Sequence, residues 1–169
     1  MGLPAKLKNF LMFVDGDSWV GEVGEVSLPK LTIAMEKWRG GGTLGEVDIA
    51  MGLEALEMEM KLGGLVRQAL RQFGVVGVAG TMLRFVGAYQ EDHAGGVSAA
   101  ELVVRGRHSE IDPGSAKAGD NTEWTVKSSL VYLKWTIDGR VEVEIDILNN
   151  VWITDGVDRM AAIRLALGQ

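Results

Sequence analysis

The sequence predicts a β-rich α+β fold, an antiparallel β-sandwich or partial barrel with two short helices. Three observations support it. Apolar and polar residues alternate with a period of two along several segments. Asp-Gly pairs stand between apolar runs, as in tight hairpins. Glycine supplies 23 of the 169 residues, about twice its usual share of roughly 7%, which is typical of a chain with many turns. We expect a single domain over residues 1–169.

The N-terminal half of the chain is predicted to be extended. Asp15-Gly16 indicates a hairpin turn, and Pro29 interrupts the next pairing because proline has no N–H to donate. Residues 53–62 are ambiguous, since Leu, Glu and Met also favour helix. Their strict alternation of apolar and charged side chains favours a strand. The predicted strands of this half are residues 9–14, 19–23, 26–28, 31–38, 47–50 and 53–62.

The C-terminal half is predicted to combine long strands with two helices. The first helix spans residues 65–73 and ends before Gly74, which suits a left-handed C-cap. Its apolar stripe consists of Leu65, Val66, Ala69, Leu70 and Phe73. The second helix spans residues 157–167, with Asp155 as N-cap and Gly168 at its end. The strands are residues 82–89, 97–108, 123–137 and 141–148, the last two joined at Asp138-Gly139, and residues 111–121 form a loop.

Charge and composition exclude several classes of protein. The net charge of −6 and the pI near 5.0 argue against a protein that binds nucleic acid through its phosphates. There is no cysteine, so disulfides and thiolate metal sites are excluded. The apolar run at residues 10–14 is too short for a signal peptide, and no stretch approaches the ~20 apolar residues of a membrane span. We therefore expect a soluble intracellular product without a membrane anchor.

One glycine-rich stretch matches the dinucleotide-binding fingerprint G-x-G-x-x-G. The match is formed by Gly40, Gly42 and Gly45. In a true site the last glycine opens a helix whose N-terminus holds the pyrophosphate. Here the following residues, 46–51, alternate as in a strand and begin with two carboxylates that would repel a phosphate. We interpret these glycines as a loop, and no cofactor is predicted.

Two groups of polar residues are candidates for chemistry. His108 with Glu110 and Asp112 would make a crude metal cluster, but a strand end running into an Asp-Pro-Gly turn explains them better, and no metal is predicted. Glu142, Glu144 and Asp146 share one face of a strand. Paired carboxylates perform acid–base chemistry in some enzymes, but a solvated or inter-subunit face is the favoured interpretation. We do not predict an enzyme.

Short sequence segments distributed over the whole chain carry a family resemblance. In order, they are "MGLPAKLKNFLMFVDGDSWVGEV", "LPKLT", "EKWRGGG", "MGLEALEMEM", "LRQFG", "EIDPGSAKAGD", "YLKWTIDGRVEVEID" and "TDGVDRMAAIRLALG". Together they resemble the major tail tube proteins of contractile-tailed bacteriophages and R-type tailocins. The resemblance runs from Met1 to nearly Gln169, which makes the whole chain one tail tube domain.

The resemblance implies a structural role in a phage or prophage tail. Such a subunit forms a homo-hexameric ring in which strands of neighbours join into one continuous β-barrel, and the rings stack into a tube inside a contractile sheath. The implied partners are the tail sheath, tape measure, baseplate and tail terminator proteins. DNA passes through the lumen without sequence-specific binding during ejection. The implied location is the virion tail, assembled in the cytoplasm of the host bacterium.

Two sets of residues follow as expectations. Charged residues opposite the apolar faces of long strands are expected to face the lumen: Glu57, Glu59, Lys61, Glu101, Arg105 and Lys127. The glycine loop is expected to contact the next ring: Gly40, Gly41, Gly42, Thr43, Leu44 and Gly45. Two other functions stay open, namely a ring protein of a contractile secretion system and a small β-sandwich hydrolase that uses Glu142 and Glu144.

Overall fold

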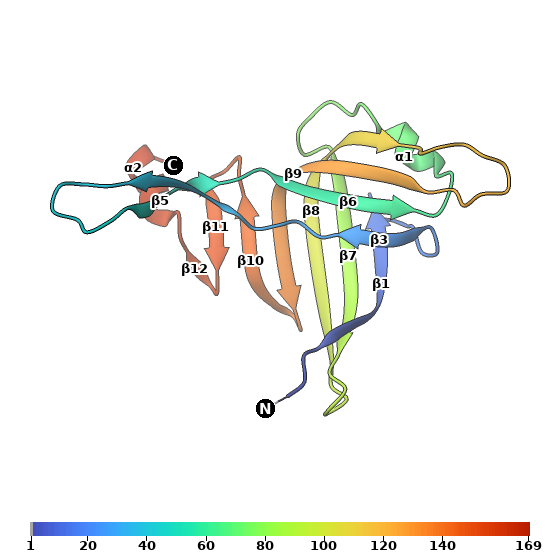
Figure 1. Ribbon diagram of the computed structural model, residues 1–169, viewed down its shortest axis with the longest axis horizontal. Helices are drawn as coiled ribbons and strands as arrows, with labels where there is room; N and C mark the ends of the chain where they lie inside the picture. The colour runs from blue at the N-terminus through green and yellow to red at the C-terminus, as the bar shows by residue number, and fades with distance from the viewer. Residues whose placement is uncertain (1) are drawn as a thin grey trace.

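The computed structural model describes residues 2–169 as a β-rich fold with two short helices (Figure 1). The strands are β1 (Lys6–Val14), β2 (Asp17–Ser18), β3 (Val23–Ser27), β4 (Ile33–Trp38), β5 (Val47–Leu53), β6 (Leu56–Leu62), β7 (Thr81–Gln90), β8 (Val97–Asp112), β9 (Trp124–Ile137), β10 (Arg140–Asp146), β11 (Val151–Thr154) and β12 (Val157–Asp158). The helices are α1 (Arg67–Gln72) and α2 (Ala161–Leu167). The predicted antiparallel β-rich class is confirmed, and the described chain is not a closed barrel.

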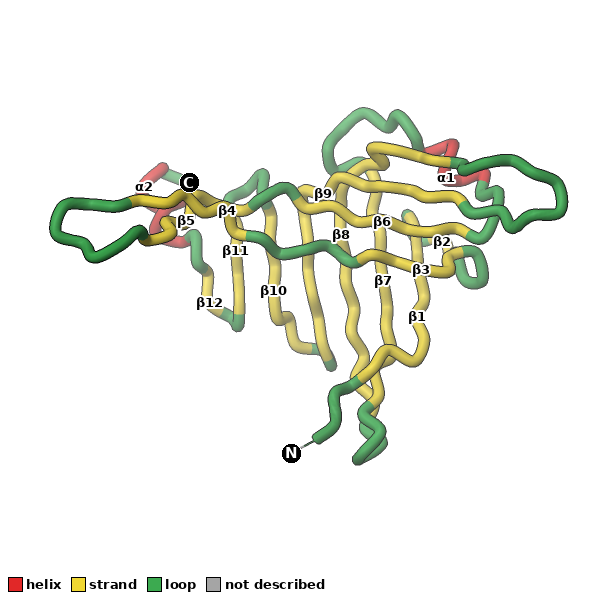
Figure 2. The backbone as a smooth tube through the Cα atoms, viewed as in Figure 1, coloured by secondary structure: helices red, strands yellow, loops and turns green. Residues whose placement is uncertain are grey.

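The strands form two walls that share β8 and β9. The large wall has the order β12-β11-β10-β9-β8-β7-β1-β2. The four-stranded wall consists of β3, β6, residues 124–130 of β9 and residues 106–112 of β8. In Figure 2, β3 and β6 run across the strands of the large wall. β4 and β5 form a separate antiparallel pair, here called the arm, which extends from one end of the molecule.

The core lies between the two walls. It is formed by alternate residues of β6, such as Met58 and Met60, which pack towards Phe85 and Leu102 of the large wall, and these side chains are at most 2% exposed. Because side chains alternate along a strand, the residues between them point out of the sandwich. The alternation of residues 56–62 therefore identified β6 and its buried face correctly.

Gly106 marks the place where β8 passes from one wall to the other. It pairs with Thr81 of β7 and Leu130 of β9, and the register of β8 on β9 is irregular at this point. A Cβ atom built on Gly106 would lie 2.0 Å from the carbonyl oxygen of Ser129. Only glycine permits the backbones of β8 and β9 to approach this closely.

Asp-Gly pairs form the tight turns of the fold. Asp15-Gly16 and Asp138-Gly139 have positive φ at both residues, as two-residue hairpin turns of this kind require. Asp155-Gly156 has the same geometry and joins β11 to β12. The prediction of Asp155 as a helix N-cap is therefore wrong: α2 begins later and its N-cap is Met160. The strand β11 was missed because its Asp-Gly turn was interpreted as a helix start.

Other boundaries differ for local reasons. Residues 19–22 form a turn and not a strand, because the chain bends to bury Trp19. α1 is shorter than predicted, and of its expected stripe only Val66 and Ala69 are buried. Gly74 has φ of +88° directly after this helix, as predicted. The strand predicted at 141–148 is β10 and ends at Asp146.

A buried polar cluster attaches α1 to the walls. His108 Nε2 lies 3.0 Å from Gln72 Oε1, and His108 Nδ1 lies 2.9 Å from Ser128 Oγ. Gln72 Nε2 donates to Asp15, which leaves its Oε1 to accept from the Nε2–H of a neutral histidine. Burial lowers the pKa of His108 from its usual 6.5, and the nearby Asp15 carboxylate opposes this in part.

The close approach at Gly106 generates a stability prediction. Gly106→Ala should lower the free energy of unfolding by about 3 kcal/mol, because the new methyl group overlaps the Ser129 carbonyl and the walls must separate. The matched control is Gly96→Ala, which meets no atom within 4 Å, and its effect should stay within about 0.5 kcal/mol. Denaturant unfolding measures both variants. Equal stability of the two would contradict this account of the bend.

The burial of His108 predicts how stability depends on pH. Below pH 6.5 the unfolded chain takes up a proton at this residue that the folded chain resists, so stability falls as the pH drops from 6.5 towards the lowered pKa of the folded state. The free energy of unfolding of the wild type should therefore decrease more than that of His108→Asn between about pH 7.5 and about pH 5.5. Parallel pH profiles of the two proteins would show that His108 titrates normally in the fold.

Candidate assembly surfaces

The outer face of the four-stranded wall is covered with charged residues. Lys61 lies 3.8 Å from Glu25 and 3.9 Å from Glu123, and Lys127 lies 3.7 Å from Glu110. Glu59 is directly opposite Lys127 in the strand register. Acidic and basic side chains therefore alternate across this face, and all of these ion pairs are partly exposed to solvent, where each contributes little to stability. Four of the predicted lumen residues are brought together here: Glu57, Glu59, Lys61 and Lys127.

Glu101 and Arg105 lie on the opposite side of the sandwich. They alternate along β8 with Leu102 and Val104, which are buried, and therefore point outwards from the large wall. Glu101 forms an ion pair of 3.1 Å with Arg84. The six predicted lumen residues are thus divided between two outer faces that point away from each other.

β10 adds carboxylates to the same outer face of the large wall. Glu144 accepts a hydrogen bond from the Tyr132 hydroxyl at 3.1 Å. Burial, together with this bond to a carboxylate, raises the pKa of Tyr132 to about 12. Glu142 lies at an irregularity in the register between β10 and β9. Glu142, Glu144 and Asp146, the carboxylates predicted to share one face of this strand, therefore lie on a hydrogen-bonded sheet surface.

Both edges of the four-stranded wall have unpaired backbone. Among residues 2–169, β3 pairs only with β6, and residues 107–112 of β8 pair only with β9. A groove of about 420 Å³ separates this edge of β8 from the loop after α1, so the edge is accessible. In the large wall, β12 pairs with Ile153 and Thr154 of β11, and the N–H of Arg159 donates to the Trp152 carbonyl, whereas residues 6–11 of β1 pair only with β7 within residues 2–169. The free N–H and C=O groups of an unpaired edge can form hydrogen bonds with another strand.

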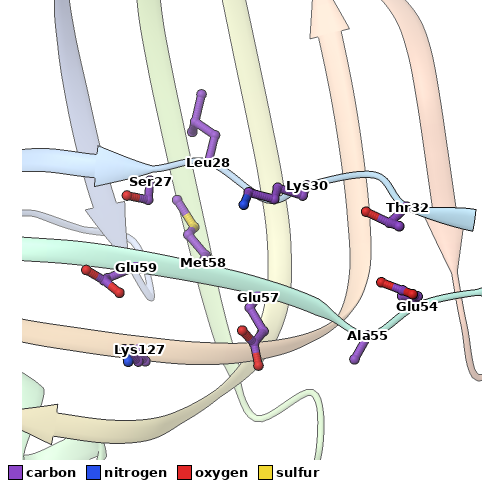
Figure 3. A pocket seen from close by; sticks show the side chains of 10 residues that line it. All are labelled: Ser27, Leu28, Lys30, Thr32, Glu54, Ala55, Glu57, Met58, Glu59 and Lys127. Carbon is purple, nitrogen blue, oxygen red and sulfur yellow. The ribbon is translucent and has the colours of Figure 1, made fainter.

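A charged groove of about 480 Å³ interrupts the four-stranded wall near the arm. The pairing of β3 with β6 ends at Ser27 and Glu59, and contact between the two chain segments resumes at Thr32 and Glu54. Pro29 lies in the intervening segment and has no N–H to pair. Figure 3 shows the side chains around this opening, with Lys30, Glu57 and Lys127 among them.

The arm is an isolated two-stranded hairpin with one apolar face. The register pairs Trp38 with Val47 and Glu36 with Ile49, which places these side chains on one face. Met51 lies on the same face by alternation, and Trp38 and Met51 are about 60% exposed. The other face carries Lys37 and Asp48, whose charged groups are 3.9 Å apart, and also Met35, which is 55% exposed. A hairpin of this kind is marginally stable alone in water, so the arm is suited to contact another molecule.

The predicted stacking loop forms the tip of the arm. Thr43 bonds to the Gly40 carbonyl through both its N–H and its hydroxyl. Gly42 has φ of +82°, whereas Gly41 has no positive φ. Leu44 is completely exposed. The glycines thus serve a tight turn between two strands, and the helix that a dinucleotide site requires does not follow them.

The candidate metal ligands have other contacts, and the described helices do not fit a membrane span. Both ring nitrogens of His108 are engaged by Ser128 and Gln72, and Glu110 pairs with Lys127. Within residues 2–169 there is no cluster of three or more His, Asp or Glu side chains arranged to hold a metal ion. No helix in that part of the chain has the length and apolar character needed to cross a bilayer.

Sequence reasoning missed two features of these surfaces. The apolar face of the arm was missed because residues 47–51 alternate as a core strand does, and only the fold reveals that they have no core to face. The open edges were missed because the alternation of side chains along a strand does not show whether its backbone is paired on one side or on both. The weak pattern that points to the arm is a glycine-rich turn between two apolar strands.

Comparison with known proteins places the chain in a family. A family profile described as phage tail tube protein FII matches residues 4–168. The chain is 39% identical to the tail tube protein of Escherichia phage P2, in a match that covers 99% of each chain. It is 40% identical to the major tail tube protein of Serratia phage KSP20, over 92% of this chain and 91% of that protein.

Solved structures share the fold at low sequence identity. The PVC sheath/tube terminator of an extracellular contractile injection system matches with a TM-score of 0.60 and 11% identity, over 79% of this chain and 96% of that one. The tube terminating cap of the anti-feeding prophage matches with a TM-score of 0.59 and 10% identity, over 80% of this chain and 93% of that one. On the strength of the profile and the two phage relatives, the chain belongs to the phage tail tube protein family, whose members are structural proteins and not enzymes.

Proposed function

We propose that this protein forms homo-hexameric rings that stack into the inner tube of a contractile tail. The observation that carries the proposal is the pair of open edges on the four-stranded wall. When β3 of one subunit pairs with residues 107–112 of β8 on the next, both edges are satisfied and the walls join into one barrel. Ring closure removes the exposed edges that would otherwise cause uncontrolled association.

The charged face of the four-stranded wall then lines the bore. Its outer residues Glu57, Glu59, Lys61 and Lys127 turn inwards, while Glu101 and Arg105 face the outside of the tube. The alternating charges neutralise one another in part, so that the bore does not hold the phosphates of passing DNA. An acidic subunit, with a net charge of −6, agrees with such a conduit.

The names of structural neighbours support several of the remaining partners. The neighbours include a sheath/tube terminator, a sheath–tube complex, a tube cap and a baseplate. We infer a sheath around this tube, a terminator and a baseplate at its ends, and a tape measure protein that sets its length. Assembly takes place in the host cytoplasm. Negative-stain microscopy of the purified protein tests the proposal: long tubes support it, isolated rings favour a secretion-system component, and monomers at high concentration contradict it.

Cysteine labelling tests which face lines the bore, since the chain has no cysteine of its own. In assembled tubes, the thiol of a Glu57→Cys variant should be shielded from a bulky maleimide reagent and become reactive when the tubes are dissociated. The thiol of an Arg105→Cys variant should react in both states, because it lies on the opposite outer face. The reverse pattern would place the large wall in the bore.

The arm tip provides a matched pair of variants for ring stacking. Gly42→Val should reduce tube formation while rings still form, because φ of +82° strains a β-branched residue and distorts the turn. Gly41→Val is the control, because Gly41 has no positive φ and no atom within 4 Å. Sedimentation followed by microscopy measures tubes and rings. Normal tube yield from Gly42→Val would show that the tip is only a linker.

A further inference from the structure

We propose that the apolar face of the arm docks on the exposed side of α1 in a subunit of the adjacent ring. The inference rests on the proposed stacking of rings and names the surface that receives the arm. The receiving surface consists of α1 and the loop after it, with exposed apolar side chains at Leu65, Leu70, Phe73, Val76 and Val78.

The two surfaces lie at opposite ends of the molecule. The arm extends from one end of the long axis, and α1 lies towards the other end, beside the loop between β8 and β9 that reaches furthest (Figure 1). Rings that stack in the same orientation bring the arm end of each subunit towards the α1 end of a subunit in the next ring. The contact is heterologous, since different patches meet, and it repeats without closing on itself, as the growth of a tube requires.

Charges on the two surfaces are complementary. Arg67, Leu70 and Arg71 share the exposed side of α1, being three and four residues apart. On the arm, the single acidic residue of the apolar face is Glu36, directly opposite Ile49. None of these three charged residues has an ion-pair partner within residues 2–169. Setting Ile49 on Leu70 brings Glu36 next to the two arginines.

α2 is the other apolar surface in reach of an arm, and it fits less well. Ile163, Leu165 and Leu167 are exposed on this helix. However, α2 lies near the base of the arm, at the same end of the molecule (Figure 1). Its Arg164 is already bound to Asp158 and to the Asn150 carbonyl, so that it offers no free cation to Glu36.

Disulfide cross-linking tests the contact in assembled tubes of the full chain. A double variant, Ile49→Cys with Leu70→Cys, is treated with a mild oxidant and separated by denaturing electrophoresis without reductant. Contacts between rings should give a ladder of linked chains that runs past the size of one ring. Each single variant should give no product beyond a dimer. A ladder that stops at one ring, or the absence of linked chains in tubes, overturns the inference. The combination of Ile49→Cys with Leu165→Cys, which tests α2 as the receiving surface, should give no ladder.

A charge exchange provides a second test that does not depend on cysteine chemistry. Glu36→Arg alone should cause a several-fold loss of sedimentable tubes while rings remain, and so should Arg67→Glu with Arg71→Glu. Combining all three changes should restore the tubes. The matched control Lys37→Glu lies on the other face of the arm and should leave stacking intact. Normal tubes from Glu36→Arg alone overturn the inference even where the oxidised variant fails to assemble. A wild type that forms no tubes overturns the proposed function itself.

Discussion

Backbone hydrogen bonding at the edges of the four-stranded wall is the constraint from which the account of this protein follows. Each unpaired N–H and C=O at a sheet edge is satisfied by water in the isolated subunit and by another strand in an assembly. The bend at Gly106 produces one of these open edges, because it carries β8 away from β7 and leaves residues 107–112 paired on one side only. A subunit with two such edges, β3 and the end of β8, has a complementary pair of surfaces for ring closure.

The distribution of side chains agrees with a subunit that completes itself by association. The sandwich core is well buried, but large apolar side chains remain exposed on the arm, on α1 and the segments that flank it, and on α2. α2 has no buried residue at all. The arm and α2 lie at one end of the molecule, and α1 lies towards the other (Figure 1). Contiguous exposed apolar surface of this kind marks sites of contact with other proteins.

Much of the fold could be predicted from the sequence, since period-two alternation is a direct consequence of strand geometry. β6, β7 and β9 were predicted close to their observed bounds, and both Asp-Gly hairpin turns that were predicted are present. β8 was predicted to end at residue 108 but continues to Asp112, past the start of the predicted loop. The third such turn was missed because an Asp before an apolar run also resembles a helix N-cap. The division of the charged residues between two faces was not predictable, because alternation shows that a residue points outwards but not which wall it belongs to. For the same reason, the glycine loop was expected to contact another ring, while the apolar face of the arm behind it was not predicted.

Hydrogen exchange of the subunit and of the assembled tube, followed by mass spectrometry, tests the central claim most directly. The claim is that tube formation pairs the two open edges of the four-stranded wall. Backbone amides of residues 23–27 and 107–112 that point to the open edges should exchange rapidly in the isolated subunit and become strongly protected in the tube, while amides at the centre of β9 are protected in both states. A tube in which these edges still exchange rapidly, and in which new protection appears along the open edge of β1 instead, would contradict the claim.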